Sequence, residues 1–143
     1  MSLDKSYLDQ FVKVTEFAAY GASPFIGKGN KNAADQGAVD RMRTELNKIE
    51  MIGTVVIGEG EMDEAPMLYI GEKVGTKKGI EIDIALDPLE GTNFTAKNLP
   101  GAFSVLVVAE KGNLLSAPDT YMEKIVIGAN LPKNLLDLDN TTE

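Results

Sequence analysis

The stretch IEIDIAL, residues 80 to 86, constrains the fold most strongly, because its β-branched and apolar residues predict a buried strand. DPLEGT follows at residues 87 to 92 and places two carboxylates, a proline and a glycine where the strand should end. Two more apolar runs, within GTVVIGEGE and AFSVLVVAEKG, predict further strands that each close in a turn containing glycine. We therefore expect a sheet whose strands end in short polar turns.

Two amphipathic helices are expected before these strands. The first should end near Gly21, and its apolar stripe consists of Tyr7, Phe11, Val14 and Ala18. The second has Asn32 as its candidate N-cap, and its apolar stripe consists of Val39, Met42, Leu46 and Ile49. Helices combined with short apolar strands predict an α/β (α+β) fold, arranged as a layered sandwich.

Composition narrows the chemistry that such a fold can perform. The net charge of −8 disfavours nucleic acid and anionic membranes as partners, and no apolar run is long enough to span a bilayer. The sequence has no Cys and no His, which excludes thiolate nucleophiles, His bases and the common zinc sites. Carboxylates as the available metal ligands indicate hard ions such as Mg²⁺ or Mn²⁺. The absence of Cys suits a cytoplasmic protein.

The DPLEGT turn is the first candidate site. Asp87 follows a strand at its carboxyl end, where ligands of α/β sheets usually bind, and Glu90 could share an ion with it. Gly91 would let the backbone approach a ligand closely, and Thr92 offers a hydroxyl where a short helix begins. The alternative is a strand-to-helix turn with two solvated acids, which is the better interpretation of D-P-x-E taken alone.

A second acidic turn, GEGEMDEAP at residues 58 to 66, also follows an apolar strand directly. Its clustered acids are Glu59, Glu61, Asp63 and Glu64. Like charges repel, so such a cluster is either solvated or neutralised by cations. If the two strands are neighbours, both acidic turns lie at one edge of the sheet, as a two-metal site requires.

Asp35 is the third candidate, because it lies four residues before Val39 on the stripe that the second helix should bury. A buried carboxylate needs a partner or a metal. The alternative is that Asp35 caps the first turn of its own helix. Lys28 and Lys31 are the nearest positive charges and could pair with these acids or with a phosphate.

Four segments together resemble the class II fructose-1,6-bisphosphatases of bacteria. They are KNAADQGAVDRMR, VVIGEGEMDEAPMLYIGEKVG, DIALDPLEGT and SAPDTYMEKIVIG. That family belongs to the lithium-sensitive, metal-dependent phosphatases, which include the inositol monophosphatases. The resemblance implies a cytoplasmic enzyme of gluconeogenesis with Mg²⁺ or Mn²⁺, which hydrolyses fructose 1,6-bisphosphate to fructose 6-phosphate and phosphate. Some relatives also accept sedoheptulose 1,7-bisphosphate.

The resemblance also implies a role for individual residues. The metal ligands it implies are Asp35, Glu59, Asp87 and Glu90. The substrate-binding residues it implies are Glu90, Gly91, Thr92 and Tyr121. The catalytic residues it implies are Asp63, Thr92 and Lys31.

Members of that family are more than twice as long as this chain. Residues 1–143 are therefore expected to be the N-terminal, metal-binding lobe, with the C-terminal lobe absent, which makes the activity of this stretch alone doubtful. Asn140 followed by Glu143 resembles a capping box for a helix that would come next, and the alternative is a polar tail. Two other functions stay open: an inactive fragment that binds metal or self-associates, and a phosphatase for another sugar or inositol phosphate. A homo-oligomer is expected.

Overall fold

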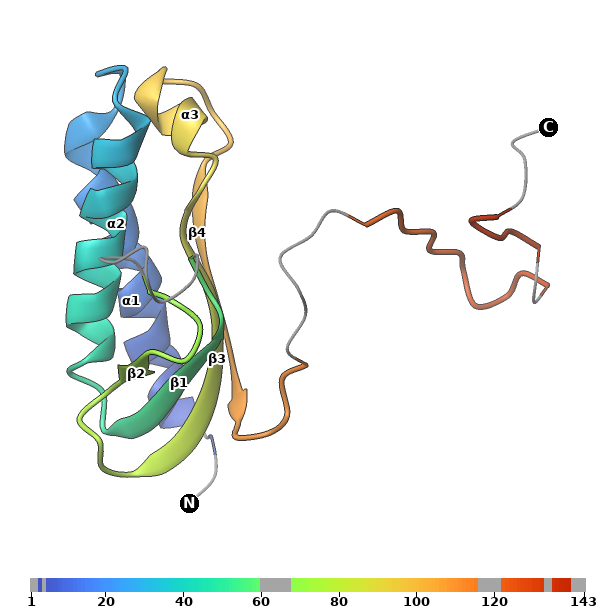
Figure 1. Cartoon of the computed structure of the whole chain (residues 1–143), viewed down its shortest axis with the longest axis horizontal. Helices are drawn as coiled ribbons and strands as arrows, with labels where there is room; N and C mark the ends of the chain where they lie inside the picture. Colours follow the sequence, from blue (N-terminus) through green and yellow to red (C-terminus); the bar gives the residue numbers. More distant parts are fainter. Residues whose placement is uncertain (1–2, 4, 60–67, 116–121, 133–134, 140–143) are drawn as a thin grey trace.

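The computed structural model describes residues 3, 5–59, 68–115, 122–132 and 135–139 (Figure 1). Asp63 and Tyr121, two of the expected site residues, lie outside the described residues, as do Asn140 and Glu143. The described residues beyond position 121 are all exposed.

Helices and strands form two layers (Figure 1). The helical elements are α1 (Lys5–Ala22), the 3-10 turn η1 (Ser23–Phe25), α2 (Lys31–Leu46) and the short α3 (Thr92–Ala96). The strands are β1 (Met51–Ile57), β2 (Lys73–Val74), β3 (Ile80–Glu90) and β4 (Phe103–Glu110). The expected α+β fold is confirmed, with α1 and α2 packed side by side against the sheet.

The sheet has the strand order β2-β1-β3-β4. β1 and β3 are parallel neighbours, whereas β2 and β4 pair antiparallel with β1 and β3. Parallel neighbours end at the same edge of a sheet. The two acidic turns, which follow β1 and close β3, therefore start from the same edge, as expected for neighbouring strands.

The core lies between the two helices and one face of the sheet. Buried side chains at helical spacing in α1 include Phe11, Val14 and Ala18, as the stripe predicted. The predicted stripe of α2 is also buried, although the helix ends at Leu46 and Ile49 lies beyond it. The N-cap prediction was wrong: the side chain of Asn30, not Asn32, accepts a hydrogen bond from the Ala33 N–H at 3.0 Å.

Along β4, every second side chain points away from the helices. Leu106 and Val108 pack against the core, whereas Phe103, Val105 and Val107 are 56%, 38% and 50% exposed. β4 is also an edge strand, with its only ladder partner on the β3 side among the described strands. This face is therefore apolar and left open by the described helices. In the part of the chain that the structure describes, no helix combines the length and apolarity that crossing a bilayer requires.

Candidate metal centre

The DPLEGT turn continues β3 before it bends. The pairing of β3 with β4 shifts between Asp87 and Glu90, and the Asp87 carboxylate accepts a hydrogen bond from the Leu89 N–H at 3.0 Å. Gly91 then adopts a φ of +83°, which L side chains rarely tolerate, and an added Cβ would lie 2.9 Å from the ring of Phe94. A helix begins at Thr92, as the sequence predicted. The turn therefore presents its two acids just before a tight backbone reversal.

The start of α2 is held next to this turn. Gly27 and Gly29 donate backbone hydrogen bonds to the carbonyl oxygens of Thr95 and Ala96, at 2.9 and 2.8 Å. These two bonds join the loop before α2 to the short helix α3. As a result, the start of α2 lies beside α3.

These elements surround one open hollow of about 340 Å³. Its lining comes from α2, from the residue two positions after β1, and from the β3–α3 turn, and consists of Lys31, Asn32, Asp35, Glu59, Asp87, Leu89, Glu90, Gly91 and Thr92. All four expected metal ligands are among them, as are Lys31, Gly91 and Thr92. Lys28 is not among the lining residues.

Burial and neighbouring acids raise the pKa of side chains that line the hollow. Burial raises the pKa of Glu59 to about 8, together with the charges of Asp35 and Asp87, a hydrogen bond with Asp87 and the charge of Glu90. Burial also raises the pKa of Asp35, and a hydrogen bond with Asp87 raises that of Glu90. Removal of these protons places repelling charges around one hollow, and a bound cation is the usual way to offset them.

The four acidic side chains line the hollow but do not converge on a single point. Among the described residues, no three acidic side chains converge closely enough to enclose a metal ion as they stand. Four of the described residues that line the hollow nevertheless carry carboxylates, and carboxylate oxygen is the ligand that Mg²⁺ and Mn²⁺ prefer. Because Mg²⁺ keeps several water ligands and takes one or two carboxylates, the donor set fits such ions.

Sequence reasoning did not single out Asn32 as a lining residue. The spacing between Asn32 and Asp35 could have indicated it, because residues three apart lie on the same side of a helix. Once the helix begins at Lys31, that spacing places Asn32 over the hollow beside Asp35. The error in the N-cap position concealed this.

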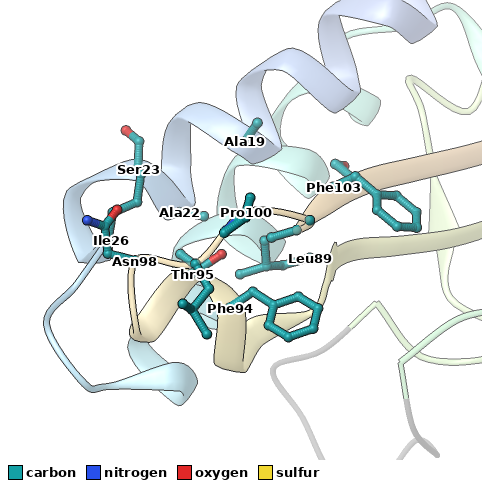
Figure 2. Close-up of a pocket in the computed structure, with 14 residues that line it drawn as sticks. Ala19, Ala22, Ser23, Ile26, Leu89, Phe94, Thr95, Asn98, Pro100 and Phe103 are labelled. Atoms are coloured by element: carbon teal, nitrogen blue, oxygen red, sulfur yellow. The ribbon is translucent and has the colours of Figure 1, made fainter.

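A second hollow of about 280 Å³ lies on the other side of the turn, and none of the described residues that line it is charged (Figure 2). Figure 2 shows Leu89, Phe94 and Phe103 gathered on one side of it. Leu89 lines both hollows, and the Phe94 ring packs against Gly91 of the acidic one. The described residues give this second hollow no carboxylate, so it is separate from the candidate metal centre.

Comparison with known proteins gives a consistent result. Residues 5–143 match the model of a family described as bacterial fructose-1,6-bisphosphatase, glpX-encoded. Fructose-1,6-bisphosphatase 1 class 2 of Escherichia coli strain K12 is 53% identical over 130 residues, which make up 91% of this chain and 38% of that protein. The class 2 enzyme of Haemophilus influenzae is 50% identical over 137 residues, or 96% of this chain and 41% of that protein.

A third relative carries a double name. The D-fructose 1,6-bisphosphatase class 2/sedoheptulose 1,7-bisphosphatase of Trichodesmium erythraeum is 48% identical over 144 aligned positions. The alignment covers 92% of this chain and 41% of that protein. The chain thus spans about two fifths of the length of the curated relatives it matches.

Proposed function

Because this chain belongs to the bacterial fructose-1,6-bisphosphatase family, we propose that residues 1–143 form the N-terminal, metal-binding lobe of a phosphatase. The substrate we propose for the whole enzyme is fructose 1,6-bisphosphate, which is hydrolysed to fructose 6-phosphate and phosphate in gluconeogenesis. Sedoheptulose 1,7-bisphosphate is a second candidate, because relatives at 48% identity carry both names. The observation that supports the proposal best is the gathering of four carboxylates around one hollow.

In this proposal Asp35, Glu59, Asp87 and Glu90 bind divalent metal, either Mg²⁺ or Mn²⁺. Such ions would supply charge neutralisation at the phosphoryl oxygens and an activated water. In the hydrolysis, a water oxygen would form the new bond to phosphorus as the bond from phosphorus to the sugar oxygen breaks, with one proton lost by the water and one gained by the sugar oxygen.

The other residues of the hollow bind and orient the substrate. Gly91 contributes only backbone to the hollow, and the Thr92 hydroxyl is available to contact a phosphate bound there. Lys31 offers a positive charge on the opposite wall. We assign Asp63 a catalytic role and Tyr121 a substrate contact from the family resemblance alone. A metabolic sugar phosphate as substrate and a chain without Cys fit a cytoplasmic location.

A second candidate is a catalytically silent domain that associates with copies of itself. Its specific support is the open apolar face of β4, formed by Phe103, Val105 and Val107. Contiguous exposed apolar side chains on an edge strand favour association. We propose a homo-oligomer on this ground, because a second copy of the chain could cover the exposed apolar face of β4.

Phosphate release from fructose 1,6-bisphosphate, measured with Mn²⁺ or Mg²⁺, tests the proposal beside calorimetric Mn²⁺ titration. Asp87→Asn is compared with Glu16→Gln, which makes the same type of change on the exposed face of α1. Metal-dependent release that Asp87→Asn abolishes would show a working site in this stretch. Mn²⁺ binding lost in Asp87→Asn, without any release, would leave a metal-binding lobe. No Mn²⁺ binding by the unmodified chain would overturn the metal proposal.

A further inference from the structure

A two-pronged ion pair joins α2 to the segment that precedes β2. The Nε of Arg43 donates to Oε1 of Glu72 at 2.7 Å, and its Nη2 donates to Oε2 at 3.1 Å. The side chains are only 25% and 13% exposed. Bidentate pairs of this kind are stronger than ordinary hydrogen bonds and fix the orientation of both partners.

Glu72 lies on the chain segment that returns along β1. Its carbonyl oxygen accepts the Val55 N–H at 3.0 Å, and the Gly71 N–H donates to the Val55 carbonyl at 2.7 Å. Farther along the same segment, the carbonyl of Leu68 accepts the N–H of Glu59 at 3.0 Å. Glu72 and Glu59 are therefore connected through one short antiparallel ladder.

Arg43 is equally well connected to the other side of the hollow. It lies on α2, eight residues after Asp35, so a rigid helix joins the two. α2 packs mainly on α1, α3 and β3 rather than on β1. The Arg43–Glu72 pair thus links the helix that carries Asp35 directly to the ladder that carries Glu59.

We propose that Arg43 is a positioning residue, which sets the separation of Asp35 and Glu59 through its ion pair with Glu72. The inference rests on the proposed metal site, and it assigns Arg43 no contact with metal or substrate. Partners that orient metal ligands typically change affinity about 10- to 100-fold when mutated. Arg43→Met keeps an aliphatic side chain but removes the guanidinium group. We therefore expect it to weaken Mn²⁺ binding about tenfold.

The test compares three variants of the full chain by calorimetric Mn²⁺ titration and by hydrogen exchange of the Glu59 amide. Arg43→Met should weaken Mn²⁺ binding and speed exchange of the Glu59 N–H. Arg43→Lys keeps the charge but cannot form the bidentate pair. Its Mn²⁺ affinity and its Glu59 exchange rate should therefore lie between those of Arg43→Met and the unmodified chain. Arg41→Met is the matched control, because Arg41 is an exposed arginine of the same helix, and it should change neither quantity.

A double-mutant cycle with Glu72→Gln keeps the test decisive if Arg43→Met folds poorly. Glu72→Gln alone should also weaken Mn²⁺ binding and speed exchange of the Glu59 N–H. The double variant should differ little from either single variant. A lower melting temperature with unchanged Mn²⁺ affinity and Glu59 exchange would reduce the pair to a purely structural role and overturn the inference. Failure of the unmodified chain to bind Mn²⁺ would overturn the metal proposal instead, and Glu59 exchange would still decide whether the pair positions this residue.

Discussion

Gly21 of α1 and Gly37 of α2 meet backbone to backbone. A Cβ at Gly37 would lie 2.5 Å from the carbonyl oxygen of Gly21, and one at Gly21 would overlap the carbonyl oxygen of Gly37. Real Cβ atoms essentially never show contacts this short, so either side chain would push the helices apart. Asp35, which lines the acidic hollow, lies two residues before this crossing on the same helix.

Gly37→Ala should therefore destabilise the chain, by about 1–3 kcal/mol in the free energy of unfolding, as overpacking usually does. The sign of this change in the free energy of unfolding is informative, because alanine at an unconstrained helix position would instead stabilise the helix by about 1 kcal/mol. Urea unfolding measures the change. Gly128→Ala, where an added Cβ meets nothing within 4 Å, is the control and should be nearly neutral. A more stable Gly37→Ala protein would mean that the helices are not in contact here.

Divalent-metal binding should strengthen as pH rises towards 8. The pKa of Glu59 in the metal-free chain is about 8, so at lower pH an ion that binds this carboxylate must displace a proton. One displaced proton corresponds to about tenfold in apparent affinity per pH unit. Mn²⁺ titrations between about pH 6 and 8, in buffers of different ionisation enthalpy, count the protons released. Affinity that does not change with pH would contradict Glu59 as a ligand.

The same carboxyl should make the metal-free chain less stable as pH increases. Its folded pKa lies above the ordinary value of 4.5, so the folded state binds the extra proton and stability falls between about pH 4.5 and 8. Glu59→Gln removes the ionisation and should flatten that decline. Urea midpoints measured with a chelator at the two ends of the range test this, with Glu16→Gln as the isosteric control. A decline of equal size in Glu59→Gln would assign it to other groups.

The open face of β4 should control self-association. Val107→Lys places a charge on that face, which should shift any concentration-dependent oligomer towards the monomer. Analytical ultracentrifugation measures the shift over a range of protein concentrations. Val126→Lys makes the same change at a position that is 94% exposed and lies well outside the sheet, so it should leave the association unaltered. Equal effects of the two substitutions would show that another surface associates.

Elements with a local chemical cause were predictable from the sequence. The strand IEIDIAL, the helix start at Thr92 and the apolar stripes of α1 and α2 all depend on residues that are near one another in the chain. The N-cap shows the limit of this approach, because Asn30 and Asn32 are both good caps by residue type. Backbone geometry, which places the Asn30 oxygen next to the Ala33 N–H, decides between them.

By itself, the sequence determined which chemistry was available: carboxylates, hydroxyls and lysines, with two acidic turns that each follow an apolar strand. Only the tertiary structure decided that β1 and β3 are parallel neighbours, so that Glu59 and Asp87 reach one hollow with Asp35. It also decided the Gly21–Gly37 crossing and the Arg43–Glu72 pair, whose partners are 16 and 29 residues apart. Residue type determines the chemistry that a side chain can perform, whereas contacts between distant segments depend on how the whole chain packs.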